Sequence, residues 1–150
     1  MERALILRAL PVLALCALLY SASSVMAQGS PMRVVLKGHD PVAYFTEGKA
    51  VKGNPKFSYD WDDGRYQFAS ARNRDMFAAN PDRYAPQFGG YCTGSMSRGV
   101  QAEADPEAWI IVDGRLYVFA QMKFKELAAA DPQYLAERIP KADKNWREKK

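Results

Sequence analysis

The sequence predicts a small single α+β domain in which two β-hairpin–helix units share an antiparallel sheet. The first observation is a repeat at an offset of fifty residues: 63–84 and 113–134 share Asp-Gly-Arg, an Ala-Ala pair and a closing Tyr. Each copy opens on Asp-Gly between strand-like residues, which favours a type I′ β-hairpin. Apolar residues at helical spacing follow each hairpin. Because an isolated hairpin is marginally stable in water, we expect the two hairpins to join in one sheet.

The predicted elements follow this repeat along the chain. Residues 32–45 offer a strand or a helical turn ahead of the duplicated core. Ser70 is a plausible N-cap for the first helix. A short last helix is expected at the C-terminal end, where Trp146 pins the chain. The hairpin strands are expected at 56–61, 65–69, 108–112 and 115–120, and the helices at 70–80, 122–130 and 135–146.

Aromatic and apolar side chains of the repeat predict the core. Phe77 of the first helix aligns with Leu127 of the second, so both are expected to face the sheet. Pro81 and Pro132 should end the two helices. The aromatic residues expected in the core are Trp61, Phe68, Phe77, Trp109, Tyr117 and Phe119, with Met76, Tyr84, Phe124 and Tyr134 packed against it.

The N-terminal stretch has the pattern of a secretory signal. Arg3 and Arg8 precede a short apolar run, and small residues surround a cleavage point after Ala27. We therefore expect a signal peptide at 1–27 and a periplasmic or secreted protein with no stable membrane span after cleavage. Cleavage removes Cys16, so Cys92 is left without a partner for an internal disulfide. The remaining boundaries are a linker at 28–35, the domain at 36–146 and a basic tail at 147–150.

The formal net charge is +4, and the excess of Lys and Arg lies largely at the C-terminal end. Such a run is typical of a solvated tail. Nucleic-acid binding needs a basic face with base-stacking aromatics, and export also argues against that class of partner.

Three strings carry a resemblance to a known family: "GHDPVAYF", the segment from Gly53 to Cys92, and "DPEAWIIVDGRLYVF". Together they resemble the YHS-domain family in its exported bacterial branch. Related modules carry metal-binding cysteines after Asp-Pro-Val and in Phe-Cys-Ser-x-x-Cys, which suits soft metals. Here Ala43, Ala69 and Asn73 occupy those places. The resemblance therefore implies the fold and not the usual metal site.

Cys92, in "FGGYCTGSM", is the leading candidate for chemistry, and three interpretations stay open. It is a buried thiol that packs like a small hydrophobe; it is a soft-metal ligand; or it is a redox-active or otherwise reactive thiol. In the second interpretation Cys92 supplies a thiolate, Met96 a thioether and His39, the only histidine, an imidazole. Copper suits this set better than zinc does.

The sequence favours a binding module over an enzyme, with a metal ion or a metal-handling protein as partner. No catalytic residues are predicted, because no signature supports a Cys-His dyad and there is no Gly-rich phosphate loop and no CxxC motif. The first hypothesis is transient soft-metal binding through Cys92. The alternatives are a thiol-based redox or acyl-transfer enzyme, and a structural or protein-interaction domain in which Cys92 is buried and inert.

Overall fold

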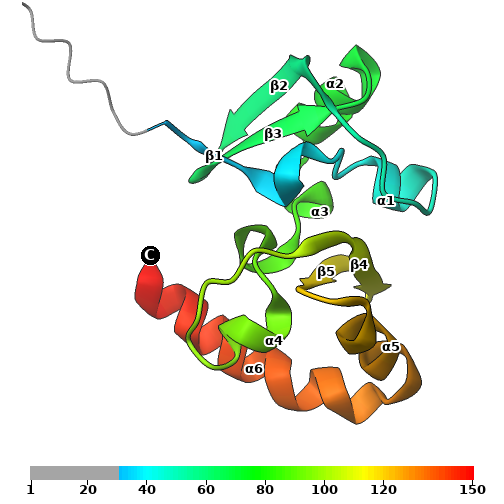
Figure 1. Ribbon diagram of the computed structural model, residues 1–150. Helices are drawn as coiled ribbons and strands as arrows, with labels where there is room; N and C mark the ends of the chain where they lie inside the picture. Colours follow the sequence, from blue (N-terminus) through cyan, green and yellow to red (C-terminus); the bar gives the residue numbers. More distant parts are fainter. Residues whose placement is uncertain (1–30) are drawn as a thin grey trace, which may run out of the picture. The chain divides into compact units, whose positions relative to one another are not determined.

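The computed structural model describes residues 31–150 (Figure 1). The predicted signal peptide lies outside the described residues. The α+β class is confirmed. Within residues 31–150, none of the helices combines the length and the apolar character needed to cross a bilayer.

The domain has two halves that share one order of elements, except that β1 has no counterpart in the second half. In Figure 1, β1, β2, β3 and α2 lie together, and β4, β5, α4 and α5 lie together against α6. The first half contains β1 (Arg33–Val34), η2 (Val35–Gly38), α1 (Ala43–Thr46), β2 (Asn54–Trp61), β3 (Gly64–Phe68), α2 (Ala71–Ala79) and α3 (Pro81–Tyr84). The second contains η3 (Gln87–Gly90), α4 (Thr93–Met96), β4 (Asp105–Val112), β5 (Arg115–Phe119), α5 (Met122–Ala130) and α6 (Pro132–Lys149).

The two hairpins do not share a sheet, which corrects the sequence-based expectation. One sheet has the strand order β1-β3-β2, with β1 parallel to β3, and the other consists of β4 and β5 alone. The short strand β1 pairs with the outer edge of β3, opposite Gly64 and Arg65, so that edge is not free for the second hairpin. Each hairpin instead packs against its own helix, and β5 of the second hairpin contributes Leu116 and Val118 to one core cluster and Tyr117 and Phe119 to the other.

The structural repeat runs one residue beyond the offset seen in the sequence. Asn54 corresponds to Asp105, Gly64 to Arg115 and Ala71 to Met122, a uniform offset of 51 residues. Both hairpins also carry an irregularity at the same place, before Ser58 in one and before Trp109 in the other. The two halves are therefore copies of one structural unit.

This shift corrects the expected turn of the first hairpin. Its two-residue turn is Asp62-Asp63, and Gly64 is the first residue of β3. A Cβ at Gly64 would lie 2.4 Å from Val35 Cγ2, so glycine is needed here for close approach and not for the turn. The second hairpin turns at Asp113-Gly114, with φ values of 50° and 72°, as a type I′ turn requires.

The same shift corrects the expected role of Leu127. Phe77 is fully buried, and its structural counterpart is Ala128, which is also buried. Leu127 corresponds to Met76 and is 48 % exposed. Aligning the two copies on the Ala-Ala pair therefore put the buried position of the second helix at Leu127, one residue before Ala128.

The helix ends are largely those expected. Ser70 Oγ accepts a hydrogen bond from the Asn73 N–H at 3.2 Å and caps α2. Pro81 and Pro132 follow the ends of α2 and α5, and each begins the next helix. The last helix, α6, has 18 residues and is longer than predicted. It includes most of the segment expected to be a basic tail, while β1 and the buried Val35 lie in the segment expected to be a linker.

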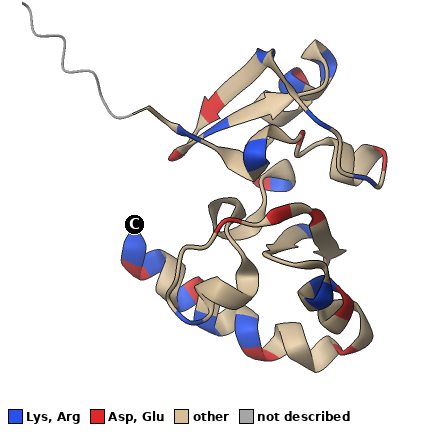
Figure 2. Ribbon diagram, viewed as in Figure 1, with Lys and Arg blue, Asp and Glu red and all other residues tan. Residues whose placement is uncertain are grey.

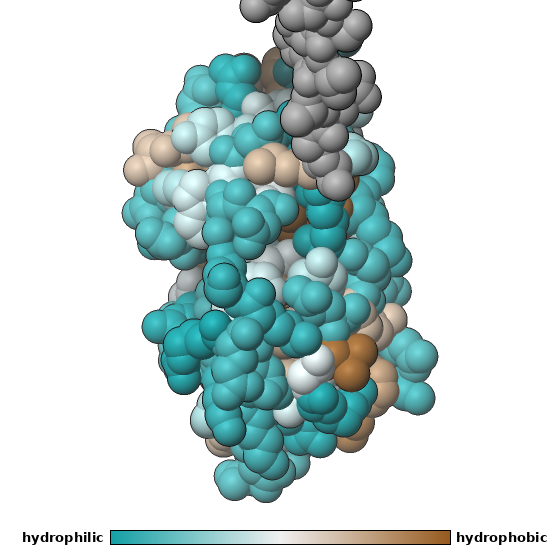
Figure 3. Space-filling model, turned by 90° about the vertical axis from the view of Figure 1, so that its left-hand side faces the viewer, coloured by the Kyte–Doolittle hydropathy of each residue, from teal (hydrophilic) through white to brown (hydrophobic). Residues whose placement is uncertain are grey.

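The core consists of two clusters, and the first of them also contains Ala104, Leu116 and Val118 of the second half. All six aromatic residues expected in the core lie in or against these clusters: Trp61, Phe68 and Phe77 with Trp109 in the first, and Tyr117 and Phe119 in the second. Tyr44 joins the halves, because its hydroxyl donates to the Pro106 carbonyl at 3.0 Å and its ring contacts Trp109 edge-on. On the face shown in Figure 3, hydrophilic residues cover most of the surface and apolar residues form small separate groups.

We expect Gly64→Ala to lower the free energy of unfolding by about 2 kcal/mol, because the added Cβ overpacks against Val35. Urea unfolding followed by circular dichroism measures the loss. The control is the same substitution in a Val35→Ala background, where the cost should fall below about 1 kcal/mol. An equal cost in both backgrounds would contradict this contact as the constraint on Gly64.

Candidate functional site

Cys92 lies at the N-cap of the short helix α4 and is 2 % exposed. It belongs to the core cluster of the second half, with Phe88, Tyr117 and Phe119. Cys92 makes no disulfide in the described chain. The thiol is therefore a buried group of the second half.

Met96 and His39 occupy different surroundings. Met96 is fully buried in the same cluster as Cys92, and its N–H donates to the Cys92 carbonyl at 2.9 Å. His39 belongs to the first half, where Nδ1 lies 3.0 Å from the Leu36 carbonyl and the backbone pairs with Lys52. Cys92 and Met96 thus come together without His39. Among residues 31–150, no three His, Cys, Asp or Glu side chains are grouped to hold a metal ion.

The duplication gives Cys92 a counterpart in the first half, namely Asp40. Both follow a left-handed stretch, Leu36-Lys37-Gly38 in one half and Phe88-Gly89-Gly90 in the other. The hydrogen bonds match as well: the Asp40 N–H donates to Val51 at 2.8 Å, and the Cys92 N–H donates to Ala102 at 2.9 Å. The thiol therefore stands where the other copy has a carboxylate.

The carboxylate of Asp40, which occupies this position in the first half, is surrounded by hydrogen-bond donors. The side chain is fully buried, and Oδ1 accepts from the N–H groups of Val42 at 2.9 Å and Ala43 at 3.4 Å. Oδ2 accepts from the Ala69 N–H at 2.8 Å and from Asn73 Nδ2 at 2.7 Å. Backbone and amide donors thus converge on one buried anion, which such donors stabilise.

In the second half, no carboxylate accepts hydrogen bonds from the corresponding backbone N–H groups. No side chain caps α4. The positions equivalent to Val42 and Ala43 are Gly94 and Ser95, and both line a small cavity at Cys92. Phe124 lines this cavity at the position of Asn73. A thiolate at Cys92 would supply the anionic acceptor that the first half has and the second half lacks.

The cavity determines what can reach the sulfur. Its volume is about 10 Å³, close to the space that one water molecule needs. Besides Cys92 and Phe124, its lining includes Tyr134 and the otherwise exposed Arg98. The next side chain along the chain, Thr93 Oγ1, is buried without a hydrogen-bond partner in the described part of the chain. The site favours reagents little larger than water.

Comparisons of the chain with protein-family models, with curated proteins and with solved structures give no match. The YHS resemblance therefore stays a prediction from the sequence.

Sequence reasoning identified Cys92 and Met96 but missed Gly94, Phe124 and Tyr134 as their surroundings. The sequence held little signal for this: at an offset of 52 residues the stretches Leu36–Asp40 and Phe88–Cys92 share only one glycine, and their equivalence lies in the left-handed backbone and the short helix that follows each. An alignment fixed at fifty residues hides this equivalence.

Asp40→Ala is expected to cost about 3 kcal/mol of unfolding free energy, since it leaves buried donors without an acceptor. Cys92→Ala at the equivalent position should cost about 1 kcal/mol, because it removes one buried sulfur and no hydrogen bond. Urea unfolding of both variants in one buffer makes the comparison. Similar losses for the two would contradict the assignment of Asp40 as a satisfied anion and Cys92 as an uncapped position.

Proposed function

We propose that the protein is an exported YHS-type module, periplasmic or secreted, in which Cys92 is a redox-responsive thiol. The equivalence of Cys92 with the buried carboxylate of Asp40 carries this proposal. The Cys92 side chain occupies the position of that carboxylate, at the start of a helix that no other side chain caps, and the thiolate is the nucleophilic form of cysteine. This proposal takes up the redox alternative that the sequence offered beside a soft-metal-binding module.

The cavity at Cys92 limits the oxidant to a small molecule such as a hydroperoxide. The thiolate sulfur attacks one peroxide oxygen, the O–O bond breaks, and hydroxide leaves with the bonding electron pair. Cys92 becomes a sulfenic acid, which is reversible. A thiol from outside the chain then displaces water to form a mixed disulfide, and a second such thiol releases Cys92.

Export is consistent with this cycle. After cleavage of the predicted signal peptide, Cys92 has no second cysteine in the chain. An internal disulfide therefore cannot trap the oxidised state, and the chain depends on an external thiol for reduction.

Soft-metal binding is the second candidate, and the burial of Cys92 and Met96 in one cluster favours it. Thiolate and thioether are ligands for Cu(I), whereas zinc takes four donors that the described residues do not group here. His39 is left out of this donor pair. A metal-handling protein would be the natural source of the ion.

For the redox proposal, hydrogen peroxide should oxidise Cys92 in the folded protein, while a bulky maleimide should react at least about tenfold more slowly than iodoacetamide. Phe124→Ala, which widens the cavity, should accelerate the bulky reagent about tenfold. Leu127→Ala, on the same helix but exposed, is the matched control and should change nothing. Intact mass spectrometry of native samples measures each rate.

Two results would overturn the redox proposal. Equal rates for small and bulky reagents would show that the cavity does not limit access. No reaction in the wild type or in Phe124→Ala would leave a structural thiol. For the metal candidate, one Cu(I) per chain should be lost in Cys92→Ala, weakened in Met96→Leu and retained in His39→Ala.

A further inference from the structure

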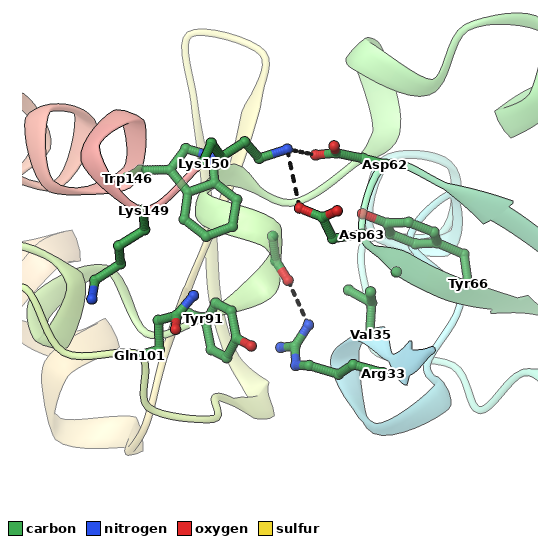
Figure 4. Close-up of a pocket in the computed structure, with 12 residues that line it drawn as sticks. Arg33, Val35, Asp62, Asp63, Tyr66, Tyr91, Gln101, Trp146, Lys149 and Lys150 are labelled. Carbon is green, nitrogen blue, oxygen red and sulfur yellow. Dashed lines mark hydrogen bonds and ion pairs between the residues drawn. The ribbon is translucent and has the colours of Figure 1, made fainter. Parts of the chain in front are cut away.

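A cleft lies where the turn of the first hairpin approaches the last turns of α6 (Figure 4). It consists of two adjoining cavities of about 110 and 180 Å³. Asp62, Tyr66, Gly89 and Trp146 line both of them. Nothing in the proposed chemistry of Cys92 uses this cleft.

The larger cavity is acidic although the chain is basic. Asp62, Asp82 and Asp143 line it, and no Lys or Arg does. Neither Asp82 nor Asp143 forms an ion pair with a described residue. Figure 2 shows basic residues along α6 and at the C-terminus, but acidic ones at the hairpin turn. The local field therefore favours a cation over an anion.

Aromatic rings form the other walls. Trp61 and Trp146 line the larger cavity. The ring of Trp146 packs against Gly89, where a Cβ would lie 2.9 Å from Cη2, so glycine allows the indole its position. Rings beside carboxylates bind organic cations, because the ring face is electron-rich.

An ammonium group of the chain itself already occupies the smaller cavity. Lys150 Nζ pairs with Asp62, lies 3.6 Å from Asp63 and is 5.4 Å from the centre of the Trp146 ring. Figure 4 shows this side chain reaching across to the two aspartates. The cleft thus holds one primary alkylammonium beside two carboxylates and an indole ring.

Tyr66 adds a polar group with no partner. Its side chain is 3 % exposed, and its hydroxyl points into the cleft (Figure 4) without a hydrogen bond to any described residue. Burial and the charge of Asp62 raise the pKa of Tyr66, so the hydroxyl stays protonated. It can accept an N–H bond from an ammonium group.

The one arginine at the cleft is already engaged. Arg33 pairs with Glu103 at 2.7 Å, donates to the Gly89 carbonyl at 2.8 Å and stacks on Tyr91 at 3.9 Å. It is therefore not free to bind an anion.

We propose that this cleft is a binding site for a protonated primary amine, held by Asp62, by the faces of the tryptophans and by the Tyr66 hydroxyl. A primary ammonium has N–H donors for the carboxylates and the phenol oxygen, which a quaternary ammonium lacks. The Lys150 side chain competes for the same place.

The test measures binding of n-butylamine and of Nα-acetyl-lysine methylamide, followed by NMR of the Trp146 indole N–H. Lys150→Met removes the competing ammonium and should tighten n-butylamine binding about tenfold. Lys144→Met, on the same helix but outside both cavities, is the matched control and should leave the affinity unchanged. Adding Asp62→Asn to Lys150→Met should abolish the gain, and n-butanol should not bind.

Every result of these titrations either supports or overturns the proposed amine-binding site. Binding of both amines would assign the site to lysine side chains as well as free amines, and binding of n-butylamine alone would restrict it to free amines. No binding of either amine to folded Lys150→Met would overturn the proposal. So would an affinity that Asp62→Asn leaves unchanged, or equal binding of tetramethylammonium.

Discussion

Hydrogen-bond donors from three segments of the first half converge on the carboxylate of Asp40. The packing of the first half depends on this convergence. The N–H groups come from the start of α1 and from Ala69 after β3, and the amide comes from Asn73 on α2. A buried carboxylate is tolerated only when such donors surround it, because it has lost its hydration. The left-handed stretch before Asp40 and the cap at Ser70 both serve this convergence, since they fix where the two helices begin.

The second half keeps the same backbone and changes the group at its centre. Cysteine replaces the carboxylate at position 92, and Phe124 takes the place of the amide that would have bonded it. The donors at the start of α4 remain, without a capping side chain. One copy thus uses the arrangement for stability, and the other offers it to a side chain that can change its charge and oxidation state. Because the two halves share one backbone arrangement, comparing them shows directly that a thiol has replaced the carboxylate.

The sequence predicts local features well and long-range ones less well. The helix over 122–130 and the second turn, Asp113-Gly114, follow from short-range rules and agree with the structure. The first turn did not, because Gly64 is constrained by Val35 across the sheet and not by its neighbours. The surroundings of Cys92 were missed for a related reason: they depend on an equivalence between segments 52 residues apart, and an alignment at an offset of fifty is two residues out of register there.

The length of α6 has a consequence for how the domain unfolds. Its counterpart α3 has four residues, whereas α6 has 18 and ends against the turn of the first hairpin. A duplicated fold without that return contact could lose one half while keeping the other. Here the last turn of α6 contacts the first half of the domain. In the other direction, the Tyr44 hydroxyl of the first half is hydrogen-bonded to the second half. The two copies should therefore melt together as one cooperative unit, all the more because Leu116 and Val118 of the second half lie in the same core cluster as Phe77 of the first.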